Sequence, residues 1–117
     1  MLNPPSEIRQ VMGLTPEQIT RIRDFMQGAI YSWVKNRPDE WFAVHDLVGG
    51  ENTEWRETPL MVLYDKHTAS KPHEQAFDAA AKDLGWLMKA LLHDDRREFE
   101  TRHDGFANTY HWTRRER

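Results

Sequence analysis

The chain has 117 residues, a formal net charge of −3 and no cysteine. Its length suits one domain with its own hydrophobic core, and the lack of cysteine excludes disulfides, thiolate metal sites and cysteine nucleophiles. No basic segment followed by an apolar one stands at the start, and no run of about eighteen apolar residues occurs, so we expect a soluble cytoplasmic protein without a membrane partner.

The sequence divides into one domain with a short extension at each end. An early Pro-Pro pair breaks regular structure, so residues 1–14 are expected to form an N-terminal arm. Helical and strand patterns then continue, without repeats or low-complexity stretches, through residues 15–114, which should form a single domain. Residues 115–117 would follow as a basic tail.

The first helix is predicted to begin at Pro16. Thr15 can cap it, and Gln18 can complete a capping box. Apolar residues then recur every three or four positions as far as Val34, which predicts one continuous buried face. The helix should end before Pro38, because proline disfavours a helical conformation in the residue before it.

The middle of the chain alternates short elements with turns. Strand-favouring residues 41–44 lead into a short helical stretch, which the Gly-Gly pair at 49–50 should end. Residues 51–57 are acidic and irregular and are expected to form an inserted loop. A second proline-led helix should start at Pro59 and end before a turn at residues 68–72.

A long amphipathic helix is predicted from Pro72 to Leu92. Its apolar residues, such as Phe77, Leu84 and Leu91, repeat at the spacing of one helical face. Gly85 lies in the middle of this helix, where glycine costs about 1 kcal/mol relative to alanine. We therefore expect another backbone to approach the helix closely at this position.

A β-hairpin is predicted to follow the long helix. Residues 97–102 and 108–113 alternate between polar and apolar side chains, and Asp104 and Gly105 between them supply a tight turn. The inward positions are aromatic: Phe99, Tyr110 and Trp112. With strand 41–44 the hairpin would form a small antiparallel sheet beside three or four helices, so the predicted fold class is α+β.

Candidate catalytic and metal-binding residues do not form a recognised motif. Six histidines are present, but no two are three or four residues apart, the spacing that places two ligands on one helical face. None of the three serines has the flanking glycines of a nucleophile elbow. We therefore predict a protein that is not an enzyme and that uses neither a metal ion nor another cofactor.

The order of helix, strand, helix, helix and hairpin resembles winged helix-turn-helix proteins over residues 15–114. The similarity lies in residues 42–47 (Phe-Ala-Val-His-Asp-Leu), in residues 81–87 (Ala-Lys-Asp-Leu-Gly-Trp-Leu) and in the closing hairpin. The chain is also similar to small proteins of phages and mobile elements, in which such domains act as transcriptional regulators, replication accessories or inhibitors of host proteins. The resemblance implies binding to double-stranded DNA.

The DNA-binding residues follow from that resemblance. Residues 96–117 carry six basic and four acidic side chains, so the hairpin segment is net positive in an acidic chain. Helix 72–92 would enter the major groove, and the hairpin would act as a wing that holds phosphates. The implied base readers are Gln75, Lys82 and Lys89. The implied phosphate contacts are Arg97, Arg102, His103, Arg114 and Arg115.

An alternative is a non-enzymatic module that binds another protein. Tyr31, Trp55 and Trp86 do not fall clearly on the predicted core faces, and exposed aromatic residues are frequent anchors of protein interfaces. If two of the three were exposed, a homodimer or a complex with a protein partner would be favoured over an isolated monomer.

Overall fold

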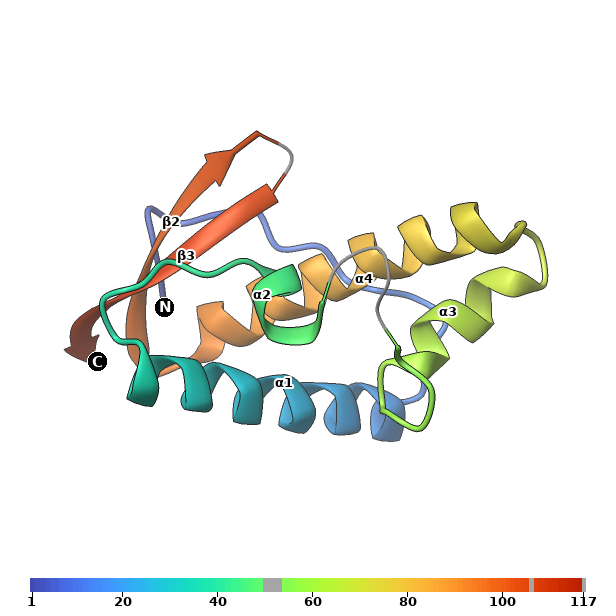
Figure 1. Cartoon of the computed structure of the whole chain (residues 1–117), viewed down its shortest axis with the longest axis horizontal. Helices are drawn as coiled ribbons and strands as arrows, with labels where there is room; N and C mark the ends of the chain where they lie inside the picture. Colours follow the sequence, from blue (N-terminus) through green and yellow to red (C-terminus); the bar gives the residue numbers. More distant parts are fainter. Residues whose placement is uncertain (50–53, 106, 117) are drawn as a thin grey trace.

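The computed structural model describes residues 1–49, 54–105 and 107–116 of an α+β fold (Figure 1). In this part of the chain, four helices precede a C-terminal hairpin, as predicted, and the sheet has three strands. The elements are β1 (Leu2–Asn3), α1 (Pro16–Asn36), α2 (Val44–Val48), α3 (Met61–Thr68), α4 (His73–Asp94), β2 (Arg97–Asp104) and β3 (Ala107–Glu116).

Helix α1 begins and ends where the sequence predicts. The hydroxyl of Thr15 accepts a hydrogen bond from the backbone N–H of Gln18 at 3.1 Å, and the Gln18 side chain accepts one from the Thr15 N–H at 2.9 Å. This reciprocal capping box satisfies two donors at the start of the helix. The buried residues lie four apart and form one stripe: Ile22, Met26, Ile30 and Val34.

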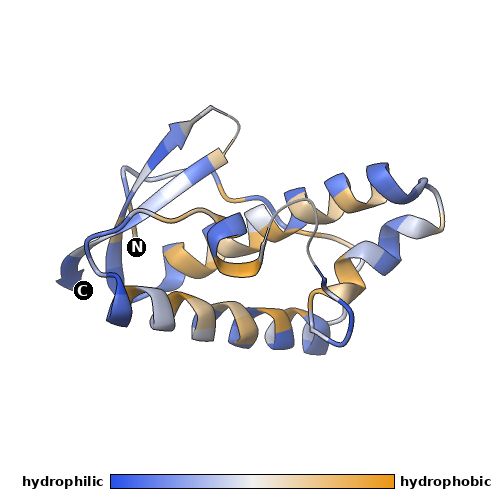
Figure 2. Cartoon of the chain, viewed as in Figure 1, coloured by the Kyte–Doolittle hydropathy of each residue, from blue (hydrophilic) through white to orange (hydrophobic). Residues whose placement is uncertain are grey.

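Helices α1 and α4 supply most of the core. Figure 1 shows the two helices running in the same general direction, with α2 in front of α4. Helix α3 folds back beside the first half of α4. Hydrophilic and hydrophobic residues alternate along both helices (Figure 2), and the buried hydrophobic residues of both belong to one core cluster. The buried stripe of α4 is Ala76, Ala80, Leu84, Leu87, Met88, Leu91 and Leu92.

The sheet is mixed, and in this respect the predicted antiparallel sheet is wrong. Strands β2 and β3 pair antiparallel, with Phe99 opposite Trp112, but β1 pairs parallel with β2. The predicted strand at residues 41–44 is reduced to one bridge, in which Phe42 and Tyr110 exchange two backbone hydrogen bonds of 2.8 Å. The strand does not continue because the Asp46 carboxylate accepts a hydrogen bond from the Ala43 N–H at 2.8 Å, and α2 begins at Val44.

The predicted N-terminal arm is partly built into the body of the fold. Leu2 is only 3% exposed and Val11 is buried in the same core cluster. The Met1 ammonium donates to the carbonyl oxygens of Leu92, Asp95 and Arg97 at 2.6–2.8 Å. The segment then passes along α4 before α1 begins (Figure 1). At the other end, the predicted tail residues 115 and 116 belong to β3, and residue 117 lies outside the described residues.

An ion-pair cluster joins α3 to α4. One carboxylate oxygen of Asp83 lies 2.8 Å from Lys66 Nζ and 2.8 Å from His67 Nε2. Lys66 also donates to the carbonyl oxygen of Met12 at 2.5 Å, so the same side chain fixes the N-terminal segment. Gln75 and Lys82, also in the first half of α4, remain exposed.

Candidate functional site

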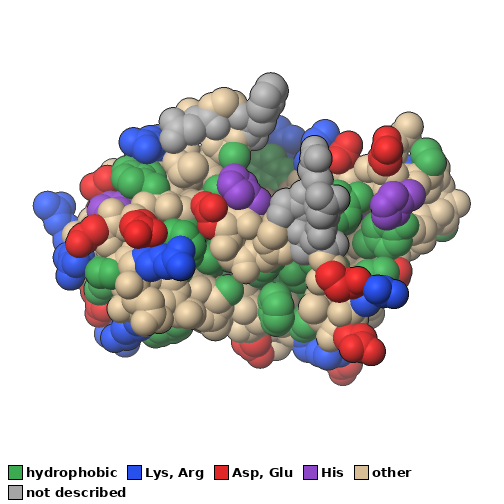
Figure 3. Space-filling view, viewed as in Figure 1, with side chains coloured by type: hydrophobic (Ala, Val, Ile, Leu, Met, Phe, Trp, Pro, Cys, Tyr) green, Lys and Arg blue, Asp and Glu red, His purple; other side chains and the backbone are tan. Residues whose placement is uncertain are grey.

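A groove of about 820 Å³ lies between α2, α4 and the hairpin. Figure 3 shows the hollow below the hairpin, with hydrophobic side chains at its floor and basic side chains beyond it. The groove is built from elements that are distant in the sequence, because the Phe42–Tyr110 bridge brings the start of α2 against β3. Its volume lies within the range of about 300–1,000 Å³ that is usual for ligand sites.

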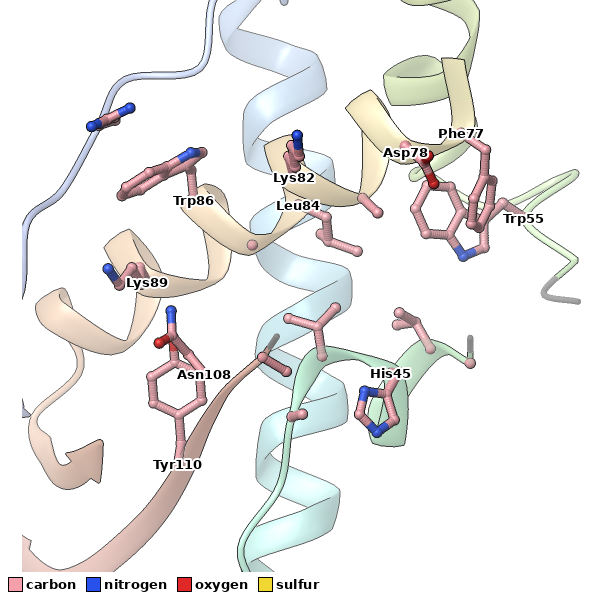
Figure 4. Close-up of a pocket in the computed structure, with 18 residues that line it drawn as sticks. His45, Trp55, Phe77, Asp78, Lys82, Leu84, Trp86, Lys89, Asn108 and Tyr110 are labelled. Carbon is pink, nitrogen blue, oxygen red and sulfur yellow. The ribbon is translucent and has the colours of Figure 1, made fainter. Parts of the chain in front are cut away.

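The floor of the groove is apolar. Leu84 lies at its centre, with Trp55 and Phe77 towards one end (Figure 4). The Trp55 and Phe77 rings pack with centroids 5.2 Å apart. The indole Nε1 of Trp55 is buried and has no hydrogen-bond partner among the described residues. At the opposite end, burial raises the pKa of the Tyr110 hydroxyl to about 12, so this side chain is neutral at physiological pH.

Basic side chains border the groove along α4. The Arg9 guanidinium and the Lys89 ammonium lie 4.9 Å and 4.8 Å from the ring centroid of Trp86, at cation–π distances. Lys82 lies one helical turn before Trp86 and is exposed. Asp78 is the one carboxylate among the described lining residues. The border therefore presents net positive charge in a chain that is acidic overall.

Gly85 lines this groove. The prediction that another backbone approaches α4 closely at this glycine is therefore wrong. A Cβ atom built at Gly85 meets no heavy atom within 4 Å. The position is helical and carries the usual cost of about 1 kcal/mol relative to alanine. Gly85 faces the open space of the groove and is not tightly packed against another element.

The predicted wing residues separate into a tip and a base. At the tip, the Arg102 guanidinium stacks on the Trp41 ring at 4.1 Å while the side chain stays exposed. His103 is also exposed, and its Nδ1 lies 3.1 Å from the side-chain oxygen of Asn108, which lines the groove. His103 therefore borders the groove through Asn108, whereas Arg102, its neighbour in β2, points to the other face of the hairpin, towards Trp41.

The base of the hairpin holds its arginines in structural contacts. Arg97 is only 7% exposed: it pairs with Asp95 at 3.3 Å and lies 3.7 Å above the Tyr31 ring. The implied role of Arg97 as a phosphate contact is therefore wrong. Arg114 pairs with Asp39 at 3.0 Å on the surface, and Arg115 is exposed, 4.0 Å from the Glu98 carboxylate.

Glu98 is a buried acidic residue at this base. Its carboxylate accepts hydrogen bonds from the Thr113 hydroxyl at 2.8 Å and from the Asn3 side-chain amide at 3.0 Å. The Thr113 hydroxyl holds the pKa of Glu98 below its ordinary value, against the opposing effect of burial. The carboxylate thus links all three strands through defined hydrogen bonds.

The three aromatic residues of the protein-partner hypothesis do not form one exposed surface. Trp55 is 6% exposed, and Trp86 is half-buried between basic side chains. Tyr31 is 45% exposed, but the Arg97 guanidinium lies over its ring. The condition of two exposed residues among the three is therefore not met.

Two groove residues were missed by sequence reasoning. The sequence predicts only an N-terminal arm around Arg9 and a strand around Asn108, and neither prediction indicates a groove. The buried apolar positions Leu2 and Val11 in the first segment are a signal that this segment packs against the body. No comparable signal in the sequence identifies Asn108.

Within the described ranges, no group of three or more His, Asp or Glu side chains is placed to hold a metal ion. None of the helices described has the length and apolar character needed to cross a membrane. No protein-family model, curated protein or solved structure gives a significant match to the chain.

Proposed function

We propose that the protein binds double-stranded DNA through α4 and the tip of the hairpin, on a winged helix-like scaffold. The observation that carries the proposal is the placement of basic side chains along the α4 border of one groove and at the tip of the hairpin that forms its other side. Arg9, Lys82 and Lys89 lie along α4, and Arg102 and His103 lie on the hairpin. Side chains of this kind supply most of the affinity of a protein for duplex DNA through contacts with phosphates.

The first half of α4 is the part proposed to enter the major groove. Its exposed residues Gln75 and Lys82 can donate hydrogen bonds to base edges, and α3 supports it from behind through the Asp83 ion pairs. The second half of α4 is packed against the N-terminal segment, where Arg9 contacts Trp86. Arg9 would therefore contact phosphate beside the helix and not base edges.

The base of the hairpin has a supporting role in this proposal. Arg97 and Arg114 are paired with carboxylates, so their charges are largely neutralised within the fold. The exposed cations of the proposed interface are instead spread over three separate segments: the N-terminal segment, α4 and the tip of the hairpin. This distribution allows a chain of net charge −3 to present a locally positive face to DNA.

A direct test is the titration of a fluorescently labelled duplex with the protein at about 50 mM salt. We expect binding at micromolar protein, since non-specific duplex binding is typically about 1–100 µM even at physiological salt. The double variant Lys82→Ala/Arg102→Ala should bind at least about tenfold more weakly, because two phosphate contacts are removed.

Arg114→Ala is the matched control for the loss of an arginine. It removes an exposed basic side chain already paired with Asp39, away from the groove. We expect it to bind DNA about as well as the wild type. If the wild type showed no binding, or if the control and the double variant lost affinity equally, the proposal would be refuted. A partner recovered from lysate after nuclease treatment, with no duplex binding, would favour the protein-binding alternative.

A further inference from the structure

We propose that Trp41 is a positioning residue of the DNA interface, and that its ring holds the Arg102 guanidinium ready to bind a phosphate of the duplex. The inference rests on the proposed binding of DNA. It goes further because Trp41 carries no charge and would act only through Arg102. The support of the Trp41 ring, the closeness of the stack and the exposure of Arg102 together carry the assignment.

The Trp41 ring is supported by strand β3. Phe42 and Tyr110 exchange two backbone hydrogen bonds of 2.8 Å, and this pairing places Trp41 beside His111 on the face of the hairpin opposite the groove. The Trp41 and His111 rings stack with centroids 5.2 Å apart and an angle of 21° between their planes. Trp41 is also half-buried. The ring therefore has a support other than Arg102.

Arg102 lies close against this ring. Its guanidinium carbon is 4.1 Å from the centroid of the Trp41 ring. In the other arginine–tryptophan pairs of the described residues, the corresponding distance is 4.9 Å or more. A guanidinium at the shorter distance gains from both the packing and the attraction of a cation to the ring. Arg102 nevertheless remains exposed at the tip.

Stacking on the ring does not use the hydrogen-bond donors of Arg102. The N–H groups of a guanidinium lie in its plane, so its edge can bind a phosphate bidentately while its face packs on an aromatic ring. A long side chain that moves freely loses conformational entropy when it binds, and one that is already held loses less. Trp41 should therefore strengthen the phosphate contact of Arg102 without adding a charge to the interface.

The test is duplex titration of the variants Trp41→Leu and Trp41→Phe. Trp41→Leu removes the aromatic face and should weaken binding by about fivefold, whereas Trp41→Phe keeps such a face and should stay within about twofold of the wild type. The salt dependence separates positioning from direct contact. Trp41→Leu should keep the wild-type slope, but Arg102→Ala should make the slope less steep by about 1.

A double-mutant cycle shows whether Trp41 acts through Arg102. In the Arg102→Ala background, Trp41→Leu should cause no further loss of affinity. Trp41→Met also lacks an aromatic face, and it decides the question should thermal unfolding show that Trp41→Leu does not fold. The inference is overturned if these variants bind like the wild type, if Trp41→Phe loses as much affinity as Trp41→Leu, or if the loss persists without Arg102.

A measurement without DNA tests the stack itself. The Arg102 Hδ resonances should be shifted upfield by the ring current of Trp41 in the wild type and should lose that shift in Trp41→Leu; an unshifted wild type would overturn the inference. Absence of duplex binding by the wild type would refute the DNA proposal and this inference together. Equal binding by the wild type and a folded Trp41→Leu variant would refute this inference alone.

Discussion

The base and the tip of the C-terminal hairpin use the same residue type for opposite purposes. At the base, Arg97 is buried against Tyr31 and paired with Asp95. At the tip, Arg102 stacks on Trp41 but remains exposed. The net charge of the hairpin counts Arg97 and Arg102 equally, yet only Arg102 is exposed and available to a ligand.

The difference arises from what surrounds each end of the hairpin. The base leaves the C-terminus of α4 and is covered by β1 and α1, so its polar side chains must find partners inside the protein. The tip extends past α2, where its described contacts include the Phe42–Tyr110 bridge and the packing of Arg102 on the Trp41 ring. Changes at the base should therefore affect stability, and changes at the tip should affect binding.

Phe99→Ala should have the largest effect on stability. Phe99 is fully buried, packs edge-on against Phe42 at 6.1 Å, and pairs with both neighbouring strands. Loss of a buried phenyl ring costs about 3–5 kcal/mol, because transfer energy and packing are both lost. Urea unfolding followed by circular dichroism would measure this, and a loss below about 1 kcal/mol would show that the base is not part of the core.

Arg97→Ala should destabilise the protein by about 3 kcal/mol, because it leaves the nearly buried Asp95 carboxylate without its guanidinium partner. Arg97→Met keeps the side-chain stem beside Tyr31 and separates the loss of charge from the loss of packing. Arg114→Ala breaks an exposed pair and should cost less than about 1 kcal/mol. Equal losses in Arg97→Ala and Arg114→Ala, in the same unfolding assay, would contradict the contrast between buried and exposed arginines.

Glu98→Gln should change the acid dependence of stability. The Glu98 pKa is lowered in the folded state from the ordinary 4.5, so its contribution is complete above that pH and is lost as the pH falls through the folded-state value. The wild type should lose stability more steeply than the variant below about pH 4.5. If the unfolding free energies of the wild type and the variant fell in parallel from pH 7 to 3, the Glu98 carboxylate would not contribute to the acid dependence of stability.

His103→Ala and Arg102→Ala should have the smallest effects on stability, within about 0.5 kcal/mol, because both side chains are exposed. Each should nevertheless weaken duplex binding. Thermal unfolding and DNA titration on the same samples would separate the two properties. A large drop in melting temperature without loss of affinity would show that the tip, like the base, contributes to stability and not to binding.

The helices and the hairpin could be predicted because their signals are local. The Thr15–Gln18 capping box sets the start of α1, and Asp104 and Gly105 precede the return strand at Ala107. The β1 strand could not be predicted in the same way. Two residues carry no periodicity, and Leu2 is ordered by pairing with Phe99, which lies far away in the sequence.

The candidate site was only partly predictable for the same reason. Lys82 and Lys89 fall on the outer side of a recognisable helix, and both border the groove. The burial of Arg97 depends on Tyr31 and Asp95, and no pattern near Arg97 records the contact with α1. The groove itself needs α2, α4 and β3 together, so only the tertiary structure defines it.

The most direct test of the proposed DNA interface is the salt dependence of duplex affinity. For the wild type, log K should fall linearly with log salt, with a slope of about −0.9 for each phosphate contact. Lys82→Ala/Arg102→Ala should make the slope less steep by about 2, whereas Arg114→Ala should leave it unchanged. An affinity that is insensitive to salt, or the same slope in all three proteins, would contradict a DNA interface formed by α4 and the hairpin tip.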